Sequence, residues 1–281
     1  MLIGICILSC GFSFTRGGQR FAIIIHAYNN ADCIERCLSS ALGQDFNNYY
    51  IVVIDDASTD HTAQIIKRHI EHSHKRRQIT LVENTTRKFA CQNFLQAIEQ
   101  YTRDEDVVVL LEGNNALAED QVLHTLDSAY RKGSPDVWLT FGQFSDKIDG
   151  DRGWCQPYSD AVVKAGAFRV VEESPFHLMT FKSWLARRID HKDCMLKGKY
   201  FQTSYDLALM YPLIEMAGKH HKFINRITCV VENNTREQSD LDKIIRGQNR
   251  YAPLYHHPHQ YCLRKDCGLC EENLYQNASA W

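Results

Sequence analysis

The stretch FAIIIHAYNNADCIERCLSSALGQDFNNYYIVVIDDASTDHT, residues 21–62, has the pattern of a strand, a helix and a second strand. Its two apolar, β-branched runs, Phe21–His26 and Tyr50–Ile54, are typical of strands buried on both faces of a sheet. Between them, residues 31–42 repeat isoleucine and leucine at helical spacing. This order predicts two parallel strands joined by a helix.

The same alternation continues to residue 141. Further strands are predicted at residues 79–82, 107–111 and 137–141, and further helices at residues 62–72, 90–101 and 121–130. Beyond Gly142 we predict a loop at 145–153, helices at 178–189, 205–217 and 240–249, and a strand at 227–231. Alternating strands and helices predict an α/β fold: one mostly parallel sheet sandwiched by helices, with an elaborated helical C-terminal region.

The composition restricts the class of protein. The 281 residues are 44% hydrophobic and 23% charged, which excludes collagen-like and disordered chains. A net charge of -2 argues against a nucleic-acid binder, and no apolar run reaches the roughly 18 residues of a membrane span. The 11 scattered cysteines are typical of reduced thiols, so we expect a cytoplasmic protein. The apolar run Leu2–Phe14 has no basic residue before it, unlike a secretory signal; we interpret it as a leader or a weak peripheral membrane contact.

Polar clusters follow three of the predicted buried strands directly. They are His26–Asn30, Asp55–Asp60 and Glu112–Asn115. Ligands of open parallel sheets bind at the carboxyl ends of the strands, so we expect these clusters to form one site. Neither GxGxxG nor GxxxxGK[ST] occurs, which argues against the common dinucleotide and P-loop sites.

Residues 21–62 resemble the opening of the family 2 inverting glycosyltransferases. The matching features are the turn Tyr28-Asn29, Ser40 with Gln44, and the strand end Asp55–Asp60. The resemblance continues through VVVLLEGNN, WLTFGQF, FHLMTF and YDLALMYPLIEMAG, to about Leu254. It implies a GT-A (Rossmann-like) fold, a nucleotide-sugar donor, and transfer to a hydroxyl of a glycan, lipid or protein acceptor. It also divides the chain into a leader (1–20), a glycosyltransferase domain (21–254) and a Cys/His-rich tail (255–281).

The resemblance assigns roles to individual residues. Asp56 would accept a hydrogen bond from the nucleobase, most simply uracil, which indicates a UDP-sugar. Asp206 would be the general base, with helix capping as the alternative role. His177 would lie on the acceptor side or only pack. We expect the donor-binding residues to be Ala27, Tyr28, Asn29, Asp56, Arg87, Glu112 and Asn114.

The motif Glu112-Gly113-Asn114-Asn115 departs from the family's Asp-x-Asp-Asp, whose middle carboxylate binds Mn²⁺ or Mg²⁺. An amide at Asn114 is a weaker ligand than a carboxylate for a hard cation. Three explanations follow. Glu112 and Asn114 bind the metal weakly together with the donor phosphates. Alternatively, Arg87 or Lys88 offsets the phosphate charge without metal, or the chain is catalytically impaired and only binds nucleotide or glycan.

Two further segments contain residues with a chemistry of their own. In the tail, five residues have metal-ligand types, so a structural Zn²⁺ site and free thiols are alternatives: His257, His259, Cys262, Cys267 and Cys270. The run Lys67–Arg77 is basic and rich in histidine, which indicates either a solvated helix end or a surface for a phosphate-rich or membrane partner.

Overall fold

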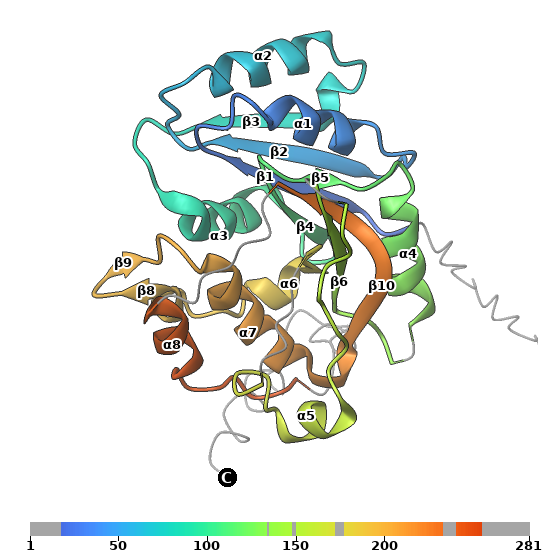
Figure 1. Ribbon diagram of the computed structural model, residues 1–281, viewed down its shortest axis with the longest axis vertical. Helices are drawn as coiled ribbons and strands as arrows, with labels where there is room; N and C mark the ends of the chain where they lie inside the picture. The colour runs from blue at the N-terminus through green and yellow to red at the C-terminus, as the bar shows by residue number, and fades with distance from the viewer. Residues whose placement is uncertain (1–17, 134, 148–149, 172–176, 233–239, 255–281) are drawn as a thin grey trace, which may run out of the picture.

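The computed structural model describes residues 18–133, 135–147, 150–171, 177–232 and 240–254. Eight strands form one sheet in the order β3-β2-β1-β4-β7-β6-β10-β5 (Figure 1). Their bounds are β1 (Phe21–Ala27), β2 (Tyr49–Asp55), β3 (Ile79–Glu83), β4 (Val107–Glu112), β5 (Ala116–Leu117), β6 (Leu139–Asp146), β7 (Thr180–Lys182) and β10 (His221–Val231). The short strands β8 (Met195–Leu196) and β9 (Lys199–Tyr200) form a separate hairpin.

The sheet is mostly parallel, as predicted. β1 pairs in parallel with both β2 and β4, so that Ile23 lies opposite Ile51 on one side and Val109 on the other. β7 is antiparallel to its two neighbours, and β5 is antiparallel to β10. The carboxyl ends of β1, β2, β3 and β4 therefore share one edge of the sheet.

Helices cover the sheet. They are α1 (Ile34–Leu42), α2 (Thr62–His72), α3 (Phe89–Tyr101), α4 (Val122–Lys132), α5 (Asp160–Ala165), α6 (Ser183–Ala186), α7 (Tyr205–Ala217) and α8 (Asp240–Arg246). Helices α3, α6 and α7 contact one another, whereas α1 contacts α2 and β5 (Figure 1). No helix in the described part of the chain is long and apolar enough to cross a membrane.

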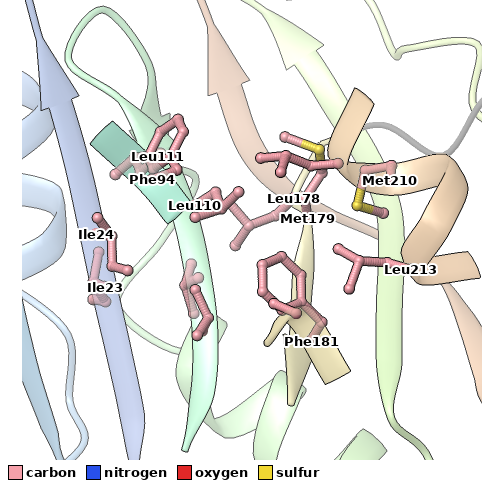
Figure 2. Close-up of a cluster of buried hydrophobic side chains, with 14 of the residues drawn as sticks. Ile23, Ile24, Phe94, Leu110, Leu111, Leu178, Met179, Phe181, Met210 and Leu213 are labelled. Atoms are coloured by element: carbon pink, nitrogen blue, oxygen red, sulfur yellow. The ribbon is translucent and has the colours of Figure 1, made fainter. Parts of the chain in front are cut away.

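Apolar side chains from segments far apart in the sequence form a common core. Figure 2 shows Ile23 of β1 and Leu110 of β4 in the same cluster as Phe181 of β7 and Leu213 of α7. All four are at most 4% exposed. The core thus joins the first strands of the chain to α7, and this packing positions the start of α7 relative to the sheet.

The helix predicted at residues 178–189 is wrong in its first half. Thr180–Lys182 form β7, and only Ser183–Ala186 are helical in α6. Apolar periodicity cannot separate a short buried strand from a helix. Here the Thr180 hydroxyl bonds with Thr140 (2.6 Å) and Tyr130 (2.8 Å), and β7 fills the gap between β4 and β6.

Other differences are matters of extent. β6 continues to Asp146 inside the predicted loop, and the predicted strand at 227–231 begins earlier, at His221. β6 and β10 lengthen each other because they pair along almost their whole length. The described cysteines are free thiols. The leader up to residue 17 and the tail from residue 255, including the five predicted zinc ligands, lie outside the described residues.

Candidate functional site

The turns after β1 and β2 hold Tyr28 at the carboxyl edge of the sheet. The backbone N–H of Asp56 donates to the carbonyl of Ala27 (2.8 Å), and the N–H of Thr59 donates to Oδ1 of Asn29 (2.8 Å). Asn29 has a φ of +51°, which asparagine tolerates better than most residues. The two turns therefore brace each other, with Ala27 buried and Tyr28 half-buried.

Asp56 is fully buried and accepts hydrogen bonds from the chain itself. Its carboxylate accepts from the backbone N–H groups of Lys88 and Phe89 and from Nδ2 of Asn84, each at 2.8 Å. His26 Nε2 lies 3.3 Å from the same group. Burial alone would raise the pKa of Asp56, but the bonds from His26, Lys88 and the asparagine amides outweigh it and hold the pKa below its usual range. A charged Asp56 thus fastens the β3–α3 loop to the end of β2.

Arg87, in that loop, covers the Tyr28 ring. Its guanidinium carbon lies 3.6 Å from the centroid of Tyr28 and 4.4 Å from that of Phe89. A guanidinium over an aromatic face is held by cation–π attraction. Neighbouring Lys88 donates from Nζ to Gln96 (3.2 Å). Arg87 is exposed, so this edge presents an aromatic ring together with a fixed positive charge.

A hydrogen bond joins the end of β4 to the start of α7. The hydroxyl of Tyr205 donates to Oε1 of Glu112. Burial and the charge of Glu112 raise the pKa of Tyr205 well above its usual value, and Asp206 adds to this increase. Phe94 packs on the Tyr205 ring at 5.3 Å between centroids. Asp206, half-buried in the first turn of α7, is thereby placed at the carboxyl edge of β4.

Arg36 binds the backbone of Asn114 and joins it to a pair of opposite charges, Glu232 and Lys147. Nη2 of Arg36 donates to the carbonyl of Asn114 (2.7 Å) and to Glu232 (2.5 Å), and Lys147 pairs with the same carboxylate (2.6 Å). No group of three His, Cys, Asp or Glu side chains that could hold a metal occurs among the described residues. Glu112 and Asn114 alone offer one carboxylate and one amide. Such a pair fits a divalent cation that receives further oxygens from donor phosphates.

His177 lies three residues before the start of β7. Its ring packs edge-on against Phe144, at 5.5 Å and 84°. β7 runs antiparallel to β4, with Thr180 opposite Val109, so the segment before β7 lies at the carboxyl edge of β4. His177 is half-buried there.

The structure gathers most of the predicted residues at one edge, and it adds some that sequence reasoning missed. Tyr205 was missed although it directly precedes Asp206. His26 was named only as part of the first polar cluster, without its contact to Asp56, and Asn84 was not among the predicted site residues. Asp60, in the second polar cluster, accepts from the backbone N–H groups of Thr62 (2.9 Å) and Ala31 (3.1 Å).

Comparison with known proteins assigns this arrangement to a class. The fold is that of GT-A glycosyltransferases. S. aureus TarS 1–349 matches with a TM-score of 0.54 at 16% identity, covering 76% of this chain and 60% of that one. The mannosyltransferase PcManGT from Pyrobaculum calidifontis, in complex with GDP-Man and Mn²⁺, matches with a TM-score of 0.53 at 21% identity, covering 76% and 57%.

The family model described as Glycosyl transferase family 2 matches residues 22–187, more than half of the chain, and the chain belongs to that family. The Bacillus subtilis (strain 168) protein named "Putative glycosyltransferase EpsE" is 30% identical over 87 residues, 31% of each chain. The chain thus spans about a third of this curated relative and at most 61% of the TarS chains.

Proposed function

We propose that this chain is an inverting glycosyltransferase that moves a sugar from a nucleotide-sugar donor, a UDP-sugar, to an acceptor hydroxyl. Family membership supports glycosyl transfer. Solved neighbours include TarS in complex with UDP-GlcNAc (15% identity, TM-score 0.54) and with UDP. The observation that carries the proposal is the Tyr205–Glu112 hydrogen bond, since it brings Asp206 to the edge that holds Tyr28 and Arg87.

Asp206 is the general base of the proposed reaction. Its carboxylate takes the proton of the acceptor hydroxyl while that oxygen forms a bond to the anomeric carbon. The bond from the anomeric carbon to the diphosphate breaks in the same step, and the nucleoside diphosphate leaves with the electron pair. His177 contacts the acceptor, because it precedes β7 at the same edge of β4.

The donor occupies the edge formed by the turns after β1, β2 and β3. Tyr28 gives the base a flat contact once Arg87 shifts, and Ala27 and Asn29 line the ribose. Both oxygens of Asp56 accept from the chain's own donors, so a contact between Asp56 and the base requires the loop at Lys88 to release one of them. The role of Asp56 in base recognition remains a prediction.

The diphosphate needs a positive charge beside it as it leaves. Glu112 and Asn114 would hold Mn²⁺ or Mg²⁺ with the donor phosphates, and the cation would neutralise the leaving group. Arg87 is the chain's own alternative, because its guanidinium lies at this edge and would turn towards the diphosphate when it leaves the Tyr28 ring. We place the transfer domain at residues 21–254 and the protein in the cytoplasm.

Replacement of Asp206 by Asn tests the base. Asp206→Asn is expected to lower transfer about 10²- to 10⁴-fold, the usual contribution of a general base, and to leave UDP affinity unchanged. Asp160→Asn is the matched control, because Asp160 is also an acidic residue in the first turn of a helix, α5, but is exposed. Transfer is measured as release of UDP from a panel of UDP-sugars. Full activity in Asp206→Asn would refute the assignment.

A nucleotide- or glycan-binding protein without catalysis is the second candidate, favoured by the amide at Asn114. Calorimetric titration of UDP with Mn²⁺, and again with a chelator, separates the cases. Binding that requires Mn²⁺ assigns a metal role to Glu112 and Asn114. Binding without metal that is lost in Arg87→Ala assigns the phosphate charge to Arg87. Binding with no UDP release from any donor would favour the second candidate.

A further inference from the structure

A hollow lined by basic side chains lies between α1 and α2, away from the site described above. It has a volume of about 610 Å³. Its lining comes from α1 and the residue after it, from the second half of α2, and from the loop that follows α2: Glu35, Ser39, Leu42, Gly43, Arg68, His69, His72, Ser73, His74 and Lys75. The loop continues into the 3₁₀ turn Arg76–Gln78, and β3 begins at Ile79. The hollow therefore faces the amino edge of the sheet, opposite the edge that holds Tyr28.

Positive charge is concentrated in the segment that lines this hollow, where Arg68 and Lys75 lie, and in Arg76 and Arg77 directly after it. The run Lys67–Arg77 has five Lys or Arg residues and one Glu, in a chain whose net charge is -2. Lys67 pairs with Glu83, but Arg68, Arg76 and Arg77 are exposed and form no ion pair with any described residue. We call these three residues the arginine rim. Exposed cations without internal partners gather anions from solution.

The shape of the surface is fixed by internal hydrogen bonds. Nζ of Lys75 donates to the carbonyls of Leu42 (2.9 Å) and Gln44 (3.0 Å) and to the Tyr49 hydroxyl (3.0 Å). Nδ1 of His72 lies 2.7 Å from the carbonyl of Arg68. Lys75 is thus used to hold the loop against the end of α1, and the arginine rim is left for an external partner.

We propose that the arginine rim docks the protein on an anionic membrane surface, with lipid phosphate groups seated over the hollow. The partner is anionic because the rim is cationic. The described part of the chain begins at Gly18 on this same edge, where Nδ2 of Asn48 donates to the Gly18 carbonyl (3.1 Å). The apolar run Leu2–Phe14 precedes Gly18 in the sequence. Nucleic acid fits less well, since no described Phe, Tyr or Trp side chain lines the hollow to stack on bases.

Membrane docking does not depend on transfer activity, and it orients the two edges of the sheet relative to the membrane. The amino edge faces the bilayer, and the carboxyl edge with Asp206 faces away from it. The contact is electrostatic and confined to the head groups, because Leu42 is the only apolar residue that lines the hollow.

Vesicle sedimentation of the full chain tests this docking. One set of vesicles is phosphatidylcholine alone, and the other is an equimolar mixture with phosphatidylglycerol. The test variant is Arg68→Gln/Arg76→Gln/Arg77→Gln. The matched control is Lys164→Gln/Lys219→Gln/Lys222→Gln, which removes three exposed charges near α5, at the opposite end of the molecule in Figure 1. Thermal unfolding confirms that both variants fold.

The wild-type chain is expected to bind the anionic vesicles and not the neutral ones. At low salt, the partition coefficient of the arginine variant is expected to be about a hundredfold lower than that of wild type. The reason is that each of the three removed cations contributes separately to the attraction to an anionic surface. The lysine control is expected to bind as wild type does. Equal binding to neutral vesicles, an equal loss in both variants, or an unchanged partition of the arginine variant would each overturn the proposal. So would binding of an oligonucleotide without binding of the anionic vesicles.

Discussion

At the scale of single residues, Asp56 shows how a buried charge organises the candidate site. Four groups from three segments donate to its carboxylate or lie beside it, and two of them are backbone N–H groups. Backbone donors cannot move away without moving the loop that carries them. Asp56 is therefore a structural anchor of the β3–α3 loop.

Replacement of Asp56 by Asn is expected to destabilise the protein by about 2–4 kcal/mol at neutral pH, because an amide nitrogen then faces an N–H donor. The free energy of unfolding is measured by urea denaturation. Asp32→Asn, at an exposed position, is the control and is expected to stay within about 0.5 kcal/mol of wild type. Equal stability of the two variants would contradict the anchor.

The lowered pKa of Asp56 also predicts how the free energy of unfolding depends on pH. The pKa of Asp56 is lower in the folded protein than in the unfolded chain, so its stabilisation is complete above the ordinary carboxylate pKa. It is lost as the pH falls from about 5 towards the folded pKa. The free energy of unfolding of wild type is thus expected to decrease more steeply with acid than that of Asp56→Asn. Parallel curves would show that Asp56 has no depressed pKa.

Sequence reasoning singled out Asp56, Tyr28 and Asp206 as candidates but not the residues that contact them. The end of a buried strand can be read from an apolar run followed by polar residues, as in YIVVIDD. The donors to Asp56 come from Lys88 and Phe89, 32 and 33 positions away, and Phe89 has a φ of +66°. A left-handed phenylalanine has no sequence signal, because it is held by its surroundings.

At the scale of elements, a buried ion pair fixes α7 and α8 together. Arg169 donates two hydrogen bonds, of 2.7 and 2.9 Å, to Glu215 of α7, and both side chains are 2% exposed. Nη1 of Arg169 also donates to the carbonyl of Ile245 in α8 (2.5 Å), and the N–H of Tyr251 donates to Glu215 (3.1 Å). The ion pair thus supplies hydrogen-bond partners to two backbone groups, the Ile245 carbonyl and the Tyr251 N–H, near the end of the described chain.

A double-mutant cycle on this pair is expected to show strong coupling. Arg169→Met and Glu215→Gln are each expected to cost about 3–5 kcal/mol, because each leaves a buried group without its partner. Arg169→Met/Glu215→Leu is expected to cost less than the sum of its single substitutions, Arg169→Met and Glu215→Leu. The measurement is chemical denaturation of the four proteins that form this cycle, with Glu215→Gln alongside. Additive costs would mean that the two side chains do not stabilise each other.

The elements differ in how well they could be predicted. α2 and α7 begin and end where the periodicity places them, at Thr62–His72 and Tyr205–Ala217. β7 was predicted as part of a helix, because its three residues form a strand only through pairing with β4 on one side and β6 on the other. A strand of that length has too few residues to show its own period.

At the scale of the whole molecule, the reactivity of the buried cysteine thiols shows whether the core is folded. Cys37, Cys91, Cys155, Cys194 and Cys229 are buried free thiols, and burial raises the pKa of Cys229 to about 12. Only the thiolate reacts, so these five are protected in the folded protein. Cys33 is half-buried.

A thiol count with Ellman's reagent tests this arrangement. At a pH of about 8, denaturation of the full chain without reductant is expected to release at least these five thiols beyond those that react in the native protein. A sample reduced beforehand is the control and is expected to give the same denatured total. A smaller total without reductant would mean that some cysteines are in disulfides. An unchanged count on denaturation would mean that the core does not protect them.

The place of β7 in the sheet affects the chain while it is being made on the ribosome. β7 lies between β4 and β6 but is synthesised after both. Until Thr180–Lys182 emerge, one side of the apolar run Val107–Leu111 has no strand to pair with. Open apolar edges are templates for association between nascent chains. The nascent chain therefore carries this open edge from the translation of β4 until that of β7.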